Sequence, residues 1–351
     1  MDIFFAFNKD DIPTFEVSKM NITCKVFLTS LIVFTVFNLF RLYFVECYYD
    51  LKEAEEDSFD LNTIFLRPKY SEVFNTWNSC FAENLLGVED PEKFWQLFEG
   101  VSQKCDSWAH VEKLGIVHLK KYERVKSVIF PKVAPFRFNL ESNNLFSIGI
   151  GRDVQFEKSF KRVRYPRLQH KKKCLKQKMQ KIGHDVQFYG VDPNFHEKEK
   201  LYSQLGDFFP ARIGMNPRIS DNMILMKDGK TQKTNVIYLD IIYYFKQLVK
   251  VKRVDHLWFD GDGGEFDDGF FDIFYRNGRF EENKIEICQI NMEIHRNPDT
   301  SERMIKFMHF VKRLIEEKRF GIFCGDHFVN NRMFMFNFQS QYCLKKFLNG
   351  P

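Results

Sequence analysis

The sequence predicts an α/β fold, a mostly parallel sheet flanked by helices, and three observations support this prediction. From residue 139 onward, segments of strand character alternate with segments of helix character, an order typical of parallel sheets with crossover helices. One apolar segment, 145–148, stops at Gly149 and Gly151, and a second, 188–191, stops at Asp192. Strands that stop at glycines and at an acid are typical of sheets that bind a nucleoside at their carboxyl ends.

The elements of this domain, 139–351, are expected in a fixed order. Short apolar and aromatic runs predict strands at 145–149, 188–191, 212–215, 256–259, 285–294 and 333–338. Helical periodicity predicts helices at 153–163, 196–205 and 240–251. Another helix is expected after Asp299, which forms a capping box with Glu302, and is expected to end near Gly321. The run of lysines and arginines at 161–181 lacks such periodicity and is expected to form an inserted basic loop.

Composition limits the classes of function. The chain has 351 residues, 44% hydrophobic and 28% charged, which suits one large folded domain with an appendage. The net charge of +5 comes from the basic run alone, so the sequence does not predict a nucleic-acid-binding protein. The eight cysteines include no Cys-x-x-Cys pair and no cluster at zinc spacing, so no metal site is expected from them.

An apolar stretch near the N-terminus predicts a membrane anchor at 26–45. It is long enough to span a bilayer if Arg41 reaches one interface, and its apolar character goes nearly all round rather than forming a stripe. A cleavable signal peptide and a buried core helix are the alternatives. Basic residues at 9, 19 and 25 precede the span, which predicts a cytosolic tail at 1–25 and a domain in the lumen of the ER or Golgi.

Two further segments precede the α/β domain. Residues 46–70 are acidic and are expected to form a solvated stem, and residues 71–138 are expected to form a small, mainly helical cap. Cys80 and Cys105 lie in this cap region. A lumenal location would allow them to form a disulfide, and two free thiols are equally compatible with the sequence.

The tips of the predicted strands carry the candidate binding residues. Glycines at 149 and 151 let the backbone turn sharply and approach a ligand where a side chain would not fit. The carboxylate of Asp192 can accept hydrogen bonds from a ribose diol. A third motif, 257–265, is an apolar strand running into an acidic, glycine-rich turn that contains Asp260, Asp262 and Glu265. Together, these tips predict a nucleoside-binding crevice.

These motifs, in this order, resemble those of the FkbM-type methyltransferases. The family signature Leu-Lys-Ile-Asp-Val-Glu-Gly-x-Glu aligns without a gap onto 257–265, where Asp260, Gly263 and Glu265 match, Asp262 stands for the family's Glu, and Trp258 replaces its Lys. The segments 238–240 and 290–295 also resemble family segments. The resemblance extends from about 144 to about 347, and it is closest to a nematode branch of membrane-tethered proteins.

The resemblance implies a class I methyltransferase fold, S-adenosylmethionine as cofactor, and an acceptor hydroxyl on a glycan, a lipid or a small molecule. Gly149 and Gly151 are then expected to line the methionine part of the cofactor, in a Gly-x-Gly-x-Asp loop that Asp153 completes. Asp192 is expected to hold the ribose, and Asp260 to lie beside the sulfonium. Because the acceptor hydroxyl must lose a proton, its base is expected among the carboxylates of the third motif, namely Asp260, Asp262 and Glu265.

Each motif also has a structural interpretation. Asp192 can begin a helix, and Asp153 and Glu157 can stabilise the first helix through its dipole. The sequence Asp260-Gly261-Asp262 can be a strand-ending turn. His256 and His295 are expected to be strand-edge histidines rather than ligands.

Two other functions remain open. In a type II membrane glycosyltransferase, Asp260 and Asp262 would hold a divalent metal. In an inactive methyltransferase fold, the chain would serve as a binding module. Ser147 stands where the family has an acid, and Asp153 where it has a glycine, and both departures favour the inactive fold.

Overall fold

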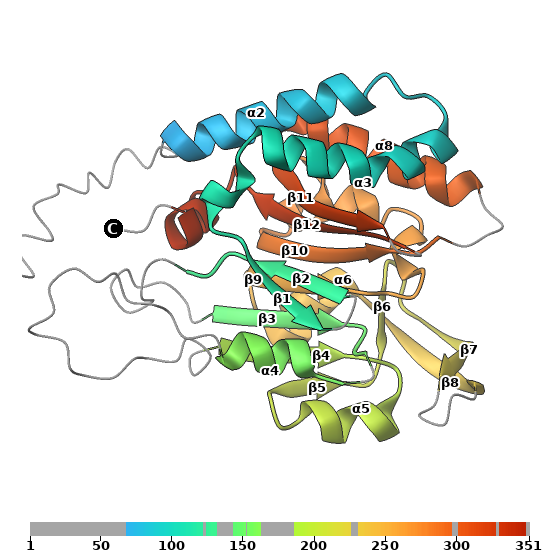
Figure 1. Cartoon of the computed structure of the whole chain (residues 1–351). Helices are drawn as coiled ribbons and strands as arrows, with labels where there is room; N and C mark the ends of the chain where they lie inside the picture. The colour runs from blue at the N-terminus through green and yellow to red at the C-terminus, as the bar shows by residue number, and fades with distance from the viewer. Residues whose placement is uncertain are drawn as a thin grey trace, which may run out of the picture. The chain divides into compact units, whose positions relative to one another are not determined.

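A seven-stranded sheet forms the centre of the described part of the chain (Figure 1). The computed structural model describes residues 68–121, 124–131, 143–151, 153–162, 186–225, 231–296, 301–327 and 330–348. The strand order is β11-β12-β10-β9-β3-β4-β5. The strands are β3 (Asn143–Ile148), β4 (Val186–Val191), β5 (Asp207–Phe209), β9 (Arg253–Phe259), β10 (Glu286–Ile294), β11 (Phe320–His327) and β12 (Asn331–Asn337).

Most pairings in this sheet are parallel. The strands β10, β9, β3, β4 and β5 pair in parallel, whereas β12 pairs antiparallel with both β10 and β11. Only three residues separate β12 from β11 in sequence, too few for the crossover that a parallel neighbour needs. The predicted α/β fold with a mostly parallel sheet is confirmed.

The two faces of the sheet are covered by different elements. Successive side chains of β3 point to opposite faces, so Leu145 packs toward α4 (Gln155–Arg162) and α5 (Phe195–Tyr202), and Phe146 packs toward the larger core on the other face. That larger core includes side chains of α8 (Ser301–Glu317) and of the helical turns η5 (Tyr244–Val249) and η7 (Phe271–Phe274).

The first two described helices belong to the same core rather than to a separate cap. Helix α2 (Pro68–Leu85) and helix α3 (Pro91–Trp108) lie beside α8 over β11 (Figure 1), and a disulfide between Cys80 and Cys105 joins them. Trp77 and Trp95 are buried against Phe323 and Phe307. These tryptophans cover apolar surface that β11 and α8 would otherwise expose, so the helical region packs directly on the central sheet.

The predicted cap region also contains two short strands. A hairpin of β1 (Val117–Lys121) and β2 (Arg124–Val128) follows the helices. Side chains of β10 hold it in place. The amide of Asn291 bonds both backbone groups of Ser127, at 2.7 and 2.8 Å, and Gln289 does the same for Ile129. The hairpin therefore covers part of the sheet.

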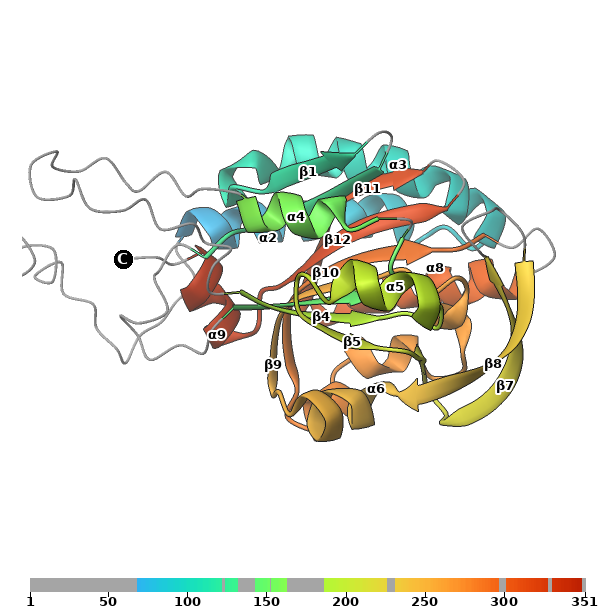
Figure 2. The same cartoon turned by 90° about the horizontal axis from the view of Figure 1, so that it is seen from below.

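A second, three-stranded sheet was only partly anticipated. It has the order β6-β8-β7, with β6 (Arg212–Gly214), β7 (Arg218–Leu225) and β8 (Thr231–Asp240). Figures 1 and 2 both show the β7–β8 hairpin extending away from the central sheet. The strand predicted at 212–215 lies in this second sheet, and the short strand β5, which was not predicted, pairs with β4.

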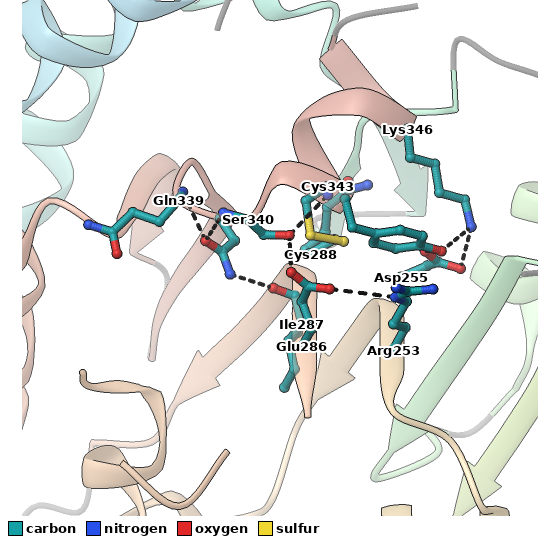
Figure 3. The surroundings of a disulfide bond; sticks show 12 residues. Arg253, Asp255, Glu286, Ile287, Cys288, Gln339, Ser340, Cys343 and Lys346 are labelled. Carbon is teal, nitrogen blue, oxygen red and sulfur yellow. Dashed lines mark hydrogen bonds and ion pairs between the residues drawn. A yellow bond between two sulfur atoms is a disulfide. The ribbon is translucent and has the colours of Figure 1, made fainter. Parts of the chain in front are cut away.

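The amino ends of the central strands carry a buried polar cluster. Asp255 on β9 is fully buried and accepts hydrogen bonds from Lys346 at 2.9 Å, Tyr342 at 3.1 Å and the backbone of Asn144 at 3.0 Å. Next to it, a disulfide joins Cys288 to Cys343 (Figure 3). Together these contacts fasten the last described elements, α9 (Gln341–Cys343) and η8 (Leu344–Leu348), under the sheet.

Several predicted features lie outside the described residues. These are the anchor at 26–45, the tail before it, the stem up to residue 67, residues 163–181 of the basic run, and the helix cap at Asp299. Among the residues that the structure does describe, no helix is both long enough and apolar enough to cross a bilayer.

Candidate active site

Three strand tips meet at the carboxyl end of the sheet, where the sequence placed its candidate residues. The backbone N–H of Gly149 donates to the carbonyl of Val191 at 2.9 Å, and that of Asp260 donates to the carbonyl of Ile148 at 2.8 Å. The ends of β3, β4 and β9 are therefore tied together. Gly149, Asp192 and Asp260 are far apart in sequence and are assembled at one edge.

The two glycines at the end of β3 have different structural roles. Gly149 has a φ of +80°, and a Cβ there would lie 1.8 Å from the backbone oxygen of Asp260. Only glycine permits this approach of β3 to β9. A Cβ on Gly151 would meet nothing within 4 Å, so the backbone there borders open space. Gly149 thus closes the strand junction, and Gly151 leaves room above the loop.

Asp192 anchors the glycine loop to the tip of β4. Its carboxylate accepts hydrogen bonds from the backbone of Ile150 at 2.9 Å and of Asn194 at 2.8 Å. Burial raises the pKa of Asp192, and these hydrogen bonds counteract part of that effect. The N-cap residue of helix α5 is Asn194 rather than Asp192. Each carboxylate oxygen retains a lone pair that a ligand hydroxyl could use.

Asp153 lies at the start of α4 and serves that helix. Its carboxylate accepts from the backbone of Gln155 at 3.0 Å and forms a close ion pair with Lys121 of β1. Although partial burial acts in the opposite direction, the hydrogen bond from Lys121 holds the pKa of Asp153 below its ordinary value. These contacts agree with the structural interpretation of Asp153, as a stabiliser of the first helix.

Glu157 places a carboxylate beside Ser147. The hydroxyl of Ser147 donates to Oε1 of Glu157 at 2.8 Å, and Glu157 is only 6% exposed. Burial raises the pKa of Glu157, and the charge of Lys126 on β2 opposes that effect. Ser147 replaces the acid of the resembled motif, so the helix supplies at this point a carboxylate that the strand lacks.

His295, at the end of β10, bridges two of the predicted acids. Its Nδ1 lies 2.9 Å from Oε1 of Glu265, and its Nε2 lies 3.3 Å from Oδ1 of Asp260. Burial lowers the pKa of His295, but the hydrogen bonds to Asp260 and Glu265 outweigh it and raise that pKa to about 10. Despite burial, contact with His295 lowers the pKa of Asp260.

His295 directly follows the last residue of β10, as expected of a strand-edge histidine, and it also joins two acids of the third motif. A signal for this contact was present in the sequence, because Glu293 and His295, two residues apart, point to the same side at the end of a strand that pairs with β9. His256 is different. It is 1% exposed, and burial lowers its pKa to about 3.

The two remaining acids of the third motif occupy opposite environments. Glu265 is fully buried and accepts from the backbones of His295 at 2.7 Å and Gly263 at 3.0 Å, so it orients its neighbours. The Asp262 side chain is 73% exposed and lies 3.6 Å from Arg212. Desolvation of its carboxylate and the charge of Asp260 raise the pKa of Asp262 even so. Asp262 is the acid that an incoming substrate can reach.

Glu293 and Lys126 complete the charged cluster. Glu293 accepts from Arg332 at 3.1 and 3.3 Å and from Asn330 at 2.8 Å. The ammonium of Lys126 lies 4.9 Å above the ring of Trp258. Burial lowers the pKa of Lys126, and the charges of Glu157, Asp260 and Glu293 oppose this effect. Neither residue was predicted as a site residue, although Glu293 lies in the segment 290–295 that resembles the family.

Comparison with known families gives one match. The family model described as "Methyltransferase FkbM domain" matches residues 79–320, which is more than half of the chain. The match begins within α2 and ends at the start of β11, so it includes every strand tip of the candidate site. No curated protein matches the chain.

Proposed function

The chain belongs to the FkbM methyltransferase family, and on this premise we propose that it is an S-adenosylmethionine-dependent O-methyltransferase with its site at the carboxyl ends of β3, β4 and β9. The family is one of methyltransferases, which generally use S-adenosylmethionine. The proposed acceptor is a hydroxyl group of a glycan, a lipid or a small molecule.

The convergence of Gly151, Asp192 and Asp260 is the observation that carries this proposal. The backbone at Gly151 borders open space, as it must where a ligand lies against a loop. Asp192 fixes this loop and has lone pairs left for ribose hydroxyls. Glu157 adds a buried carboxylate beside Ser147, the position where the resembled motif has an acid, which favours an active site over an inactive fold.

The cofactor, when bound, supplies a methyl group that the acceptor oxygen attacks, the C–S bonding electrons leaving with the sulfur. The protein then has to orient the acceptor and receive its proton. Asp262 suits the role of proton acceptor, because its carboxylate is exposed and its pKa is raised. Asp260, kept ionised by His295, can orient the acceptor by accepting a hydrogen bond from its hydroxyl.

We also propose that the domain works in an oxidising compartment, anchored by the segment at 26–45, as in the nematode branch that its motifs resemble. Two disulfides, Cys80–Cys105 and Cys288–Cys343, support this proposal, because cytosolic thiols are kept reduced. The orientation remains the one that the basic residues before the anchor predict, with the domain in the lumen of the ER or Golgi.

Calorimetric titration with S-adenosylhomocysteine tests the function. We expect the full-length chain in detergent to bind the product with micromolar affinity, and Asp192→Ala to weaken binding at least about tenfold, equivalent to about 1.4 kcal/mol. Asp221→Asn, which changes an exposed acid on β7, is the matched control. A folded wild-type protein that does not bind the product would contradict the proposal. A sugar nucleotide with Mn²⁺ would then test the glycosyltransferase alternative.

A further inference from the structure

We propose that Asp260, Glu293 and His295 form a binding site for a divalent cation at the carboxyl ends of β9 and β10. One oxygen from each carboxylate and one ring nitrogen all lie within 4.8 Å of one another. Donors on opposite sides of one ion, with bonds of about 2.1 Å, are about 4.2 Å apart. Small rotations of these side chains would therefore bring the three donors onto one ion.

The orientation of His295 is the first support for this site. Glu265, which is fully buried, faces Nδ1 of the ring at 2.9 Å and fixes it, so that Nε2 points at Asp260. A carboxylate behind a histidine is the usual second-layer support of a metal ligand. Without an ion, the ring must carry a proton on Nε2. A cation would replace that proton between the ring and Asp260.

The state of Asp260 is the second support. Its Oδ1 is buried and forms an ion pair with Nε2 of His295 at 3.3 Å. This distance is longer than that of a usual charge-assisted hydrogen bond, so the carboxylate keeps capacity for another ligand. An ion placed between Oδ1 and Nε2 would contact both atoms.

Glu293 is held ready for the same role. Arg332 and Asn330 donate to its two oxygens and fix their direction, as an outer layer of donors does for metal-binding carboxylates. Each oxygen has a further lone pair for coordination. Side chains alternate along β10, and His295 directly follows its last residue. Glu293 and His295, two residues apart, therefore point to the same side.

The donor set indicates which cation would bind. Two carboxylates and one imidazole suit Mn²⁺ or Zn²⁺ better than Ca²⁺, which prefers oxygen donors alone. Asp262 and Glu265 bring the number of nearby carboxylates to four, and the neighbouring cations are Arg212, Arg332 and Lys126. A divalent ion would reduce the repulsion among these acids.

A role for the ion in catalysis rests on the proposed function. Three protein donors leave coordination positions open, and an acceptor hydroxyl can occupy one of them. A bound cation lowers the pKa of such a hydroxyl. When the O–CH₃ bond replaces the O–H bond, the proton can pass to the carboxylate of Asp262, which is 4.0 Å from Nε2 of His295.

Binding of Mn²⁺ to the full-length chain tests the site, measured by electron paramagnetic resonance after treatment with EDTA. We expect one tight site per chain, and we expect Glu293→Gln and His295→Gln each to weaken it about 10- to 100-fold. Asp221→Asn, remote and exposed, should bind as the wild type does. Parallel titrations with Zn²⁺ and Mg²⁺ would establish the preference.

The outcomes separate this inference from the proposed function. Absence of Mn²⁺ binding by the wild type, or binding that both variants retain, overturns the cation site. Binding of S-adenosylhomocysteine is measured on the same metal-free samples, since the glycine loop and Asp192 do not include the proposed ligands. If Mn²⁺ binds and the product does not, the methyltransferase function fails and the cation site stands. If a variant is unfolded, a Mn²⁺-dependent rise in the melting temperature of the wild type, absent with Mg²⁺, supports the site, and no such rise overturns it.

Discussion

Two aspartates at opposite ends of β9 show how differently one strand can use a carboxylate. Asp255, near the start of the strand, is fully buried and is bonded by Lys346, Tyr342 and Asn144. Asp260, just past its end, is 23% exposed, and the partner of its Oδ1 is His295, whose Nε2 lies 3.3 Å away. The first carboxylate is saturated by the protein, and the second has capacity left for a ligand.

This difference separates a structural charge from a functional one. A buried charge is tolerated only when the fold supplies all of its partners, and it then fixes one arrangement of the chain. A charge whose partners are incomplete costs stability but can bind something else, and such groups are concentrated at functional sites. Four substitutions test this division, from the largest expected effect to the smallest.

Replacement of Asp260 should separate activity from stability. We expect Asp260→Asn to lower kcat/KM at least about 100-fold, the scale of lost acid–base and charge stabilisation. Unfolding free energy should change by less than about 1 kcal/mol, since His295 keeps its ion pair with the buried Glu265. Urea denaturation and steady-state methyl transfer provide the two measurements. A variant as active as the wild type would place Asp260 with the structural acids.

Replacement of Lys346 should lower stability and leave ligand binding unchanged. We expect Lys346→Met to lower the free energy of unfolding by about 3–5 kcal/mol, because it leaves the Asp255 charge buried without its cation. In the folded fraction, affinity for S-adenosylhomocysteine should be unchanged. The double variant Asp255→Asn with Lys346→Met should be more stable than Lys346→Met alone. If it is not, the pair does not act as a saturated charge.

Glu157 tests whether a buried acid can serve the binding site. We expect Glu157→Gln to weaken binding of S-adenosylhomocysteine about tenfold, because the amide keeps the contact with Ser147 but removes the negative charge that attracts an ammonium. Ser147→Ala, which keeps the carboxylate, should have a smaller effect. Calorimetry on both variants gives the comparison, and equal affinities for Glu157→Gln and wild type would contradict it.

Asp106, on α3, is an intermediate case with a pH signature. Its Oδ2 accepts from Cys324 at 2.7 Å, and its Oδ1 is buried without a partner. Burial raises its pKa from 3.8 to about 7 in the folded state. The folded state therefore binds the proton more tightly than the unfolded state, and the wild type should lose stability as pH rises from about 4 to about 7.

Asp106→Asn should remove this loss. We expect the variant to be more stable than the wild type by up to about 4 kcal/mol above about pH 7, and about equally stable below about pH 4. Thermal unfolding across this range is the measurement. A difference that does not vary with pH would mean that Asp106 does not titrate as the structure indicates.

The part of the candidate site that lies at strand tips could be predicted from the sequence. Apolar runs ending at Gly149, Asp192 and Asp260 were enough, because parallel strands bring their carboxyl ends to one edge. Those residues whose neighbours come from other elements were missed. Glu157 meets Ser147 across a helix–strand contact, and no local pattern reveals such a pair.

The predicted fold was least accurate in its short and edge strands. Strand β5 has three residues, too few to show alternation. Strand β11 contains Gly321 and Gly325, which interrupt its apolar pattern. The region of α2 and α3 was predicted to be mainly helical, but nothing in its own pattern shows which surface it covers. That surface depends on β11 and α8, which lie about two hundred residues later in the chain.

The cluster around Asp255 also has a consequence for biosynthesis. Asp255 and Lys346 are 91 residues apart, and Cys288 must wait for Cys343 in the same way. At roughly 5–20 residues per second, β9 emerges from the ribosome about 5–20 s before the lysine that neutralises it. Until Lys346 is synthesised, the central strand carries a charge that lacks its cation. Chaperones and oxidoreductases therefore have to protect the nascent chain until residues 343–346 emerge, and these residues permit the sheet to close.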